Sequence, residues 1–539
     1  MDGEMLESGG GRPAGWARAV VEWIVITAVF AAAGAWPTPD VNEAVYLTKA
    51  RHAADAHWGR GDFFLETPDA HGVFYLVAGP VAAATSLDHA AWIGRVVGWA
   101  LLAVGFRTAA LPLLPSAWTR VLAALVFSFA LRTTTAAGEW VIGGCEAKVF
   151  AWAAALGGIG AVAAGRFPEA CLRCGIATAF HPIVGGWSLV ATVVTWAVDR
   201  VREDRSDEDH RCSQGRVSWR DVALVAGGVA TAAAGIVPAL GLTAGVDAVT
   251  RAAATRIYVV DRLSHHLLPR TFADGMIARH LLAVAVWWLL TRLLPSRSPG
   301  RRIAMFTWVA LAISAAGIGI SLLEAWAPAT TYGLLRYYWF RLADVAVPFA
   351  LATTLAAVLG NATACGRLAS CPPSWLRGAV VAVLAADLAV QSLHWPLPGR
   401  ESPAPRADAK LAAAAWADIC DWVRDQTPPE ARFLTPRGSA SFTWRTGRSE
   451  VVSWKNSPQD AASLVEWRRR ILDCFSRSGS LVDMERSTVS LGPERLREVA
   501  ERYGADHAIV PLDVPLLDSI PGERLHANGT YAVYRLASP

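Results

Sequence analysis

Residues 20–43 read VVEWIVITAVFAAAGAWPTPDVNE, an apolar stretch followed directly by a proline-rich turn and two acids. The apolar part, Val20 to Trp36, approaches the roughly 20 residues that a helix needs to cross a bilayer. Arg12 and Arg18 precede it, so the positive-inside rule places the N-terminus in the cytoplasm. A signal peptide is the alternative, but the many later apolar runs favour a retained first span.

The composition divides the chain into two parts. Of the 96 Lys, Arg, Asp and Glu residues, 37 lie in the last 139 positions, so the tail is about 27% charged and the first 400 residues about 15%. So little charge excludes a disordered linker or a water-exposed repeat array for the first part. We therefore expect a polytopic membrane domain at 1–399 and a soluble domain at 400–539. The net charge of +4 gives no reason to expect nucleic acid as a partner.

Further apolar runs predict a bundle of about eleven transmembrane helices. They lie at 72–86, 90–112, 118–134, 147–165, 171–198, 219–245, 278–294, 303–323, 343–360 and 376–395. The run at 72–86 is short and contains Gly79-Pro80, so we expect it to lie on the membrane or re-enter it. The run at 171–198 is too long for one span, and His181-Pro182 divides it into two short helices. In the alternative count of spans, 72–86 crosses the membrane and 171–198 crosses it once as an unbroken helix.

The distribution of arginine predicts the sidedness. The loops 201–216 and 293–302, and the one holding Arg367 and Arg377, are Arg-rich and should be cytoplasmic. The long loops 246–277 and 324–341, the first outer loop at 37–89 and the C-terminal domain then face outward. The chain is expected in the cell (inner or cytoplasmic) membrane, with its N-terminus inside and its C-terminus outside.

The first outer loop begins with two acids. Asp40 and Glu43 are three positions apart directly after Pro39, so a helix starting there carries both carboxylates on one face. Two carboxylates so placed can bind a divalent cation such as Mg²⁺ or Mn²⁺, or one can act as a general base. An ordinary helix cap by Asp40 with a solvated Glu43 is the alternative.

A second outward stretch, LRTTTAAGEWVIGGCEAKVFAW, contains further charges beside a span. Glu139, Glu146 and Lys148 lie close to glycines, where a backbone can approach a ligand closely. Charged residues at span borders are candidates for function. The alternative is an interfacial anchor pair between Glu146 and Lys148.

The third stretch, RIYVVDRLSHHLLPRTF (256–272), is basic. Its cations and imidazoles suit a phosphate or pyrophosphate, and they are Arg256, Arg262, His265, His266 and Arg270. Adjacent histidines are weaker candidates for metal ligands, because neighbours in a helix or strand point in different directions.

A fourth stretch, RYYWFRLADVAVP (336–348), brings Arg341 and Asp344 to the start of an apolar span. This pair either serves a ligand or neutralises itself at i,i+3 spacing. Cys171 and Cys174 have the CxxC spacing but no second pair for zinc, so we expect free thiols. No P-loop, GxSxG or HExxH motif occurs in the sequence, which argues against a nucleotide-driven pump or a common hydrolase.

The last 139 residues predict a small α/β domain. Helical periodicity at 411–426, 463–475 and 493–503 alternates with short apolar strands, ARFLTP after the first helix and DHAIVPL after the last, and the domain ends in the strand YAVYRLA (531–537). Residues 442–456 are expected to form a strand, a turn and a strand. This segment carries candidates for sugar or phosphate binding, namely Trp444, Arg445, Arg448, Trp454 and Lys455. Core tryptophans with solvated arginines are the alternative.

The whole layout resembles the GT-C superfamily of integral membrane glycosyltransferases, which includes oligosaccharyltransferase catalytic subunits and protein mannosyltransferases. That family has a first span, a long acidic outer loop, many further spans and often an outward α/β domain. DVNE at 40–43 is similar to its first acidic motif, and LRTTTAAGEW with Glu139 is similar to its second outer loop. The paired acids of that second loop are replaced here by Glu139 and the distant Glu146.

The resemblance implies transfer of a sugar from a polyprenyl-phosphate-linked donor to an acceptor on the extracytoplasmic face of the cell envelope. It implies Asp40 as base or metal ligand, with Glu43 and Glu139 as acidic partners. The expected phosphate-binding residues are Arg262, His265, His266 and Arg341, with Lys148 and His71. The competing hypothesis is a non-enzymatic membrane protein, either a carrier or a degenerate family member that only binds lipid.

Overall fold

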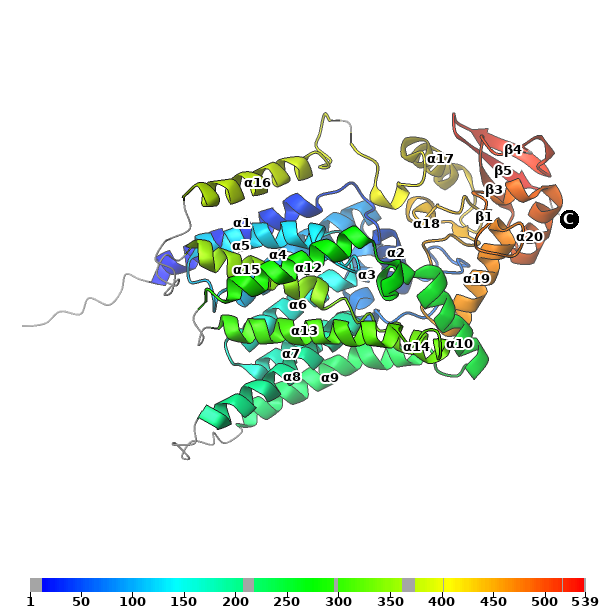
Figure 1. The fold of residues 1–539 in the computed structure, drawn as a ribbon. Helices are drawn as coiled ribbons and strands as arrows, with labels where there is room; N and C mark the ends of the chain where they lie inside the picture. The colour runs from blue at the N-terminus through cyan, green and yellow to red at the C-terminus, as the bar shows by residue number, and fades with distance from the viewer. Residues whose placement is uncertain are drawn as a thin grey trace, which may run out of the picture.

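The computed structural model describes residues 12–206, 218–294, 299–360, 374–400, 402–515 and 517–537. Long helices run side by side as a bundle, and a small domain with a β-sheet covers one end of it (Figure 1). The mainly helical fold with a C-terminal α/β domain is therefore confirmed. Parts of the expected cytoplasmic loops, residues 207–217, 295–298 and 361–373, lie outside the described residues.

Each apolar run expected to span forms a helix. The bundle contains α1 (Arg12–Gly34), α4 (Leu87–Ala110), α5 (Ala117–Thr133), α6 (Ala147–Ala163), α7 (Phe167–Phe180), α8 (Pro182–Ser206), α9 (Trp219–Gly241), α12 (Asp274–Thr291), α13 (Gly300–Ser321), α15 (Ala343–Gly360) and α16 (Ser374–Ser392). Within the described residues, six helices are long and apolar enough to cross a membrane: α1, α4, α8, α9, α13 and α15. A multi-pass membrane protein follows, while the count of eleven crossings stays a prediction.

The two awkward runs behave as their prolines suggest. The run at 72–86 forms the helix α3 (Gly72–Ala84), whose 13 residues are too few to cross a bilayer. The run at 171–198 breaks between α7 and α8 at His181, because Pro182 lacks the N–H that a continuous helix needs. The helix after the break, α8, is longer than expected and continues to Ser206.

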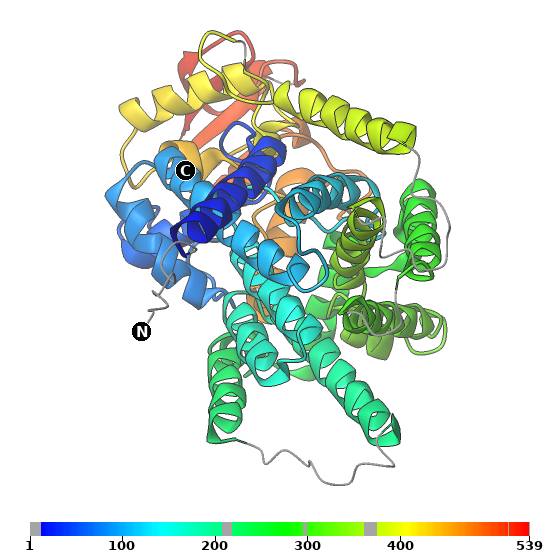
Figure 2. The ribbon, with the colours of Figure 1, turned by 90° about the vertical axis from the view of Figure 1, so that its left-hand side faces the viewer.

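The bundle is held by close helix contacts and an aromatic core. The rings of Phe30, Phe106, Phe127 and Phe349 contact one another with centroids 5.3–6.4 Å apart. Where α4 crosses α6, a Cβ on Gly105 would lie 2.2 Å from the Ala153 carbonyl oxygen, so only glycine permits this approach. Figure 2 shows the bundle from the end opposite to the small domain, with several helices, such as α8 and α16, running obliquely across the view.

The C-terminal domain is a five-stranded sheet with helices against it. The strands are β1 (Arg432–Leu434), β2 (Ser449–Glu450), β3 (His507–Pro511), β4 (Gly522–Ala527) and β5 (Tyr531–Leu536), in the order β2-β1-β3-β5-β4. The helices are α17 (Ala413–Gln426), α18 (Phe442–Thr446), α19 (Ala461–Phe475) and α20 (Pro493–Tyr503). The hairpin expected at 442–456 is wrong: α18 occupies its first half, and β2 pairs parallel to β1.

Short helices lie at the end of the bundle that the domain covers. They are α2 (Glu43–Ala54), α3, α10 (Ala248–Arg256), a π-helical segment (Ile257–Arg262), α11 (Ser264–Leu267) and α14 (Pro328–Leu335). The first outer loop is bound to the domain through Asp62, which accepts hydrogen bonds from Thr443 Oγ1 (3.2 Å) and the Glu450 amide (3.0 Å). Loops expected to share one side of the membrane therefore do share one end of the molecule.

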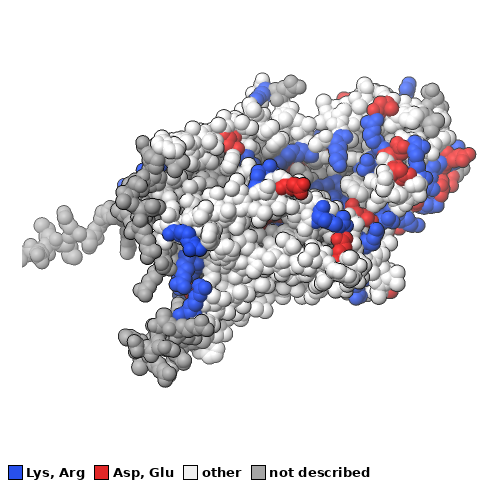
Figure 3. Space-filling model, in the orientation of Figure 1, with Lys and Arg blue, Asp and Glu red and all other residues white. Residues whose placement is uncertain are grey.

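The charge distribution agrees with a membrane around the bundle. Charged side chains crowd the surface of the C-terminal domain, while the middle of the bundle is mostly uncharged and a basic strip lies near its opposite end (Figure 3). Which end faces the cytoplasm stays a prediction.

Candidate functional site

A cavity of about 500 Å³ lies between the covered end of the bundle and the C-terminal domain. It is lined by five Lys and Arg side chains, two carboxylates and four histidines, so positive charge prevails. These residues are Lys148, Arg262, Arg336, Arg341, Lys455, Asp69, Glu139, His71, His181, His265 and His266. The cavity collects residues from all four outward stretches predicted from the sequence and from the domain, which makes it the candidate site.

The first pair of predicted acids does not line this cavity. Glu43 is fully buried and accepts two hydrogen bonds from the Arg95 guanidinium, at 2.7 Å and 2.6 Å. Its oxygens also accept from the amides of Asp40 and Cys145, both at 2.7 Å. Glu43 therefore holds the start of α2 against α4 and the loop before α6.

Asp40 is also fully buried, and its partner comes from the linker that leads into the C-terminal domain. Arg406 donates from Nε and from a terminal nitrogen to the two Asp40 oxygens, both at 2.5 Å, and its guanidinium lies over the Trp36 ring. With both carboxylates paired to guanidinium groups, this arrangement does not fit a divalent cation at Asp40 and Glu43. Among the described residues, no group of three or more His, Cys, Asp and Glu is placed to bind a metal.

Glu139 does line the cavity, within a network of alternating charges. Its carboxylate lies 2.8 Å from Arg341 Nε and 3.9 Å from Lys148 Nζ. Lys148 also lies 3.5 Å from Glu146 and stands over the Trp140 ring. Each cation in this network thus has an acidic partner.

The loop that carries Glu139 is positioned by a buried acid in a span. Asp344, at the start of α15, accepts hydrogen bonds from the amides of Ala136 (2.6 Å), Ala137 (2.9 Å) and Glu139 (3.2 Å). The expected i,i+3 pair of Asp344 with Arg341 does not form; Arg341 turns to Glu139 instead. Asp344 therefore has a structural role in shaping the cavity wall.

Asp69 and His71 form a pair at the cavity wall. The Asp69 carboxylate lies 2.6 Å from His71 Nδ1 and 3.7 Å from Lys49 Nζ. Burial alone raises the pKa of the Asp69 carboxyl, but His71 and then Lys49 lower that pKa to about 2. An anion at Nδ1 keeps the proton on that nitrogen and leaves the lone pair on Nε2. This acid was missed in the sequence, although it lies in the same acidic outer loop as Asp40.

Arg262 and Lys455 differ from Lys148 and Arg341, the two cations of the cavity that have acidic partners. In the described part of the chain, neither has a carboxylate within ion-pair distance, and Arg262 Nε is a buried donor without a hydrogen-bond partner. The one polar contact between them is a 3.3 Å hydrogen bond from Arg262 to the Lys455 carbonyl oxygen. Burial, and then the charge of Arg262, lowers the pKa of the Lys455 amine to about 8. The two groups form a half-buried positive site to which the described part of the chain supplies no counter-ion.

The histidines and tyrosines complete the lining. His266 Nδ1 lies 2.5 Å from the Ala137 carbonyl oxygen. Burial, and then the charge of His265, lowers the pKa of His266 to about 3. A neutral His266 with a carbonyl partner is the donor in that bond. Tyr338 has φ of 54°, a backbone conformation that non-glycine residues seldom adopt, and its ring lies under the Arg341 guanidinium. Such a residue is typical of a functional site.

The structure thus brings together seven of the nine predicted site residues. Glu139, Arg262, His265, His266, Arg341, Lys148 and His71 line one cavity, whereas Asp40 and Glu43 lie behind its wall. Of the aromatic and basic candidates in the domain, Lys455 reaches the cavity. Trp444 is buried, Arg445 pairs with Asp408, and Arg448 binds carbonyl groups at the end of α17.

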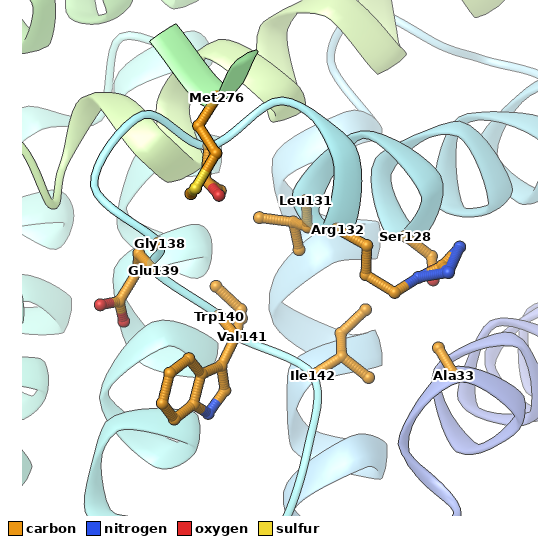
Figure 4. A pocket seen from close by; sticks show the side chains of 11 residues that line it. Ala33, Ser128, Leu131, Arg132, Gly138, Glu139, Trp140, Val141, Ile142 and Met276 are labelled. Atoms are coloured by element: carbon orange, nitrogen blue, oxygen red, sulfur yellow. The ribbon is translucent and has the colours of Figure 1, made fainter. Parts of the chain in front are cut away.

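A second, smaller cavity of about 260 Å³ adjoins the first across the segment that carries Glu139 and Trp140, which line both. Its walls are mostly apolar and include Ala33, Leu131 and Ile142 (Figure 4). The Glu139 carboxylate points away from the Arg132 guanidinium in this view. Arg132 pairs instead with Asp387 of α16.

Comparison with known proteins gives one family match and several distant structural likenesses. Residues 414–474 match a domain of unknown function, DUF6798. No curated protein matches the chain. Among solved structures, the arabinofuranosyltransferase AftD from Mycobacteria matches with 14% identity and a TM-score of 0.47, over 99% of this chain and 42% of that one. The present chain therefore spans less than half of that protein.

Two further solved structures are similar over most of this chain. The Archaeoglobus fulgidus oligosaccharyltransferase has 12% identity and a TM-score of 0.34, over 92% of this chain and 68% of that one. ArnT from Cupriavidus metallidurans has 14% identity and a TM-score of 0.31, over 97% and 98% of the two chains. Because all of these TM-scores lie below 0.5, the activities of those proteins do not transfer to this chain.

The layout of elements predicted from the sequence is present in outline. The structure has an N-terminal apolar helix, an outer loop with the short helices α2 and α3, further apolar helices and an α/β domain at the same end as that loop.

Proposed function

We propose that this protein is a membrane-embedded glycosyltransferase that takes a sugar from a polyprenyl-phosphate-linked donor and transfers it to an acceptor outside the cytoplasm. The observation that carries the proposal is the pair of half-buried cations, Arg262 and Lys455, without a counter-ion among the described residues. Two neighbouring cations removed from water are costly unless an anion joins them. A phosphate group supplies that anion and accepts the hydrogen bond that Arg262 Nε lacks.

The walls of the cavity favour a lipid-linked phosphate over a soluble one. Pro182 and Ile183 at the start of α8, and Ala239 and Leu242 at the end of α9, form an apolar side of the cavity. Both helices are candidate membrane spans. A polyprenyl chain in the bilayer therefore has an apolar path along these helix ends to the cations.

The charges of the cavity match the chemistry of the transfer. As the bond between the sugar carbon and the phosphate oxygen breaks, its electron pair stays with the phosphate, whose negative charge grows next to Arg262 and Lys455. The acceptor hydroxyl forms the new bond to the sugar carbon and loses its proton. His71 Nε2 takes this proton, and the Asp69 anion at Nδ1 stabilises the imidazolium that results.

The remaining acids take positioning roles in this proposal. Glu139 orients Arg341 and Lys148, and Asp40 and Glu43 hold α2 and the linker in place. No step requires the divalent cation expected from the sequence, whose participation stays a prediction.

The direct test uses the full-length protein in lipid nanodiscs with a panel of polyprenyl-phosphate-linked pentoses and hexoses. The release of polyprenyl phosphate in the presence of acceptor is followed by mass spectrometry. We expect His71→Ala to slow the release about 10²- to 10⁴-fold, the usual contribution of a general base, with little change in donor affinity. Gln426→Ala, at the exposed end of α17, is the control and keeps the rate of the unchanged protein.

A non-enzymatic lipid-binding protein is the second candidate, and one observation favours it. Asp40, the acid of the first motif, is fully buried and paired to Arg406, so it is not free to act as a base. If polyprenyl phosphate binds but no sugar is released from any donor of the panel, this candidate replaces the transferase.

A further inference from the structure

One loop of the C-terminal domain, residues 454–460, lies between β2 and α19 and reaches into the cavity. At one end the Ala461 amide donates to the Leu242 carbonyl oxygen at 2.9 Å, which ties the loop to the end of α9. In its middle, Lys455, Ser457, Pro458 and Gln459 line the cavity. The loop therefore forms the wall of the cavity on the side of the C-terminal domain, opposite the bundle.

Gln459 contacts the Asp69–His71 pair directly. Its side-chain oxygen accepts from the Ala70 amide at 3.3 Å, and its side-chain nitrogen lies 3.3 Å from His71 Nδ1. Both contacts cross from the domain to the first outer loop. Because His71 Nδ1 donates its proton to Asp69, the contact with the Gln459 nitrogen is packing and not a hydrogen bond. Gln459 therefore restrains the peptide next to His71 and packs against its ring.

The loop is anchored within the domain by a buried acid. Asn456 donates to Glu450 Oε1 at 2.9 Å, and Ser453 donates to the same oxygen at 2.8 Å. Thr435 donates to the other oxygen at 3.0 Å. Because Glu450 is 3% exposed, these bonds are shielded from water, and the loop is a firmly held part of the domain.

We infer that this loop is part of the donor site: Lys455 binds the phosphate of the polyprenyl donor, and Gln459 positions His71 for proton transfer. The loop lies within residues 414–474, so the inference assigns a role to the segment that matches a domain of unknown function. It rests on the proposed function, and it makes the C-terminal domain a wall of the reaction chamber instead of a separate module.

The test of Lys455 measures the affinity of full-length protein in zwitterionic nanodiscs for a long-chain polyprenyl monophosphate without sugar. We expect Lys455→Met to weaken binding about 10- to 100-fold, the range for a lost charge-assisted hydrogen bond, and Lys455→Arg to retain most of it. Arg524→Met is the control, because this exposed arginine of the same domain does not line the cavity and its charge does not act on Lys455. Equal affinity in Lys455→Met and the unchanged protein would overturn the inference and would leave the proposed function to rest on Arg262 alone.

The pH dependence gives a second readout that does not depend on the stability of Lys455→Met. The groups whose charges act on Lys455 are Arg262, Lys148, Lys410 and Glu146. The free Lys455 amine has its pKa at about 8, so it loses its proton and its attraction for phosphate as the pH rises through that value. Binding should therefore weaken between about pH 7 and about pH 9, where the phosphate, with its second pKa near 6, is already a dianion. In Lys455→Arg the guanidinium stays charged, and this loss should disappear. The same decline in both proteins would contradict the inference.

The test of Gln459 separates positioning from binding. We expect Gln459→Leu to lower kcat about tenfold, with the affinity for polyprenyl monophosphate unchanged, since the side chain contacts His71 and not the phosphate. Gln459→Glu, which keeps the shape and can still accept from Ala70, should retain more of the rate. A parallel fall of kcat and affinity, or no change in either, would refute the positioning role. Failure of the unchanged protein to bind polyprenyl phosphate would instead refute the proposed function itself.

Discussion

Two charged clusters at the same end of the molecule differ in one respect, which is whether their charges are balanced. In the first, Glu43 pairs with Arg95 and Asp40 with Arg406, and both acids are fully buried. In the second, Arg262 and Lys455 line the cavity next to each other, and no carboxylate of the described residues lies within ion-pair distance of either. We call them the paired cluster and the open cluster. Buried charges that are paired need no ligand and are costly to unpair, whereas unpaired ones call for a ligand.

The largest expected effect is on stability, from breaking the paired cluster. Glu43→Gln leaves the Arg95 guanidinium buried without its anion, and Arg95 is 1% exposed. We expect a loss of ~3–5 kcal/mol in the free energy of unfolding. Thermal unfolding in nanodiscs measures it, with Glu501→Gln on the exposed face of α20 as control. The double variant with Glu43→Leu and Arg95→Met should recover much of the loss.

A Glu43→Gln protein that is as stable as the unchanged protein but lacks transfer activity would contradict this prediction. Glu43 would then be a reacting group, and the comparison of the two clusters would fail.

The next effect concerns binding in the open cluster. Arg262→Met removes a guanidinium whose Nε has no hydrogen-bond partner, so it breaks little in the unliganded protein. We expect the affinity for polyprenyl monophosphate to fall about 10- to 100-fold with the unfolding temperature unchanged or raised. Arg524→Met, an exposed arginine of β4, should change neither quantity. A marked loss of stability in Arg262→Met without loss of affinity would place Arg262 in the scaffold.

The smallest expected effect is at the Asp40–Arg406 pair. The Arg406 side chain is 33% exposed, so water can replace part of what its guanidinium gives to Asp40. We expect Arg406→Gln to cost ~1 kcal/mol of stability and to leave the transfer rate within about twofold. A rate that rises instead would show that Arg406 restrains Asp40 as a base, which would move the first acidic motif back into the reaction.

The sequence predicts much of the fold because that part of the fold is local. Pro182 ends one helix and starts another, and the short run before Thr85 cannot span a bilayer; both conclusions follow from a few neighbouring residues. The hairpin expected at 442–456 was wrong because its second strand, Ser449–Glu450, finds its partner in β1, which precedes α18 in sequence and pairs in parallel. Short apolar segments leave this choice to tertiary contacts.

The sequence predicts which residues lie at the site, but not which of their charges have a partner. Acids and bases in outer loops indicate a site at that end of the molecule, and seven of the nine residues do meet there. Whether each charge has a partner depends on residues far away in sequence, since Arg95 and Arg406 lie 52 and 366 positions from the acids that they neutralise. For the same reason Gln459 gave no signal, because its partners lie 388 and 389 positions away.

The most direct measurement maps where the donor phosphate lies. A polyprenyl phosphate with a photoreactive group beside its phosphate is crosslinked to the full-length protein in nanodiscs, and the labelled peptides are identified by mass spectrometry. We expect labels in residues 256–266 and 454–460, around the open cluster, and we expect excess unlabelled polyprenyl phosphate to suppress this labelling. Labels confined to residues 36–43, around the paired cluster, would contradict this expectation.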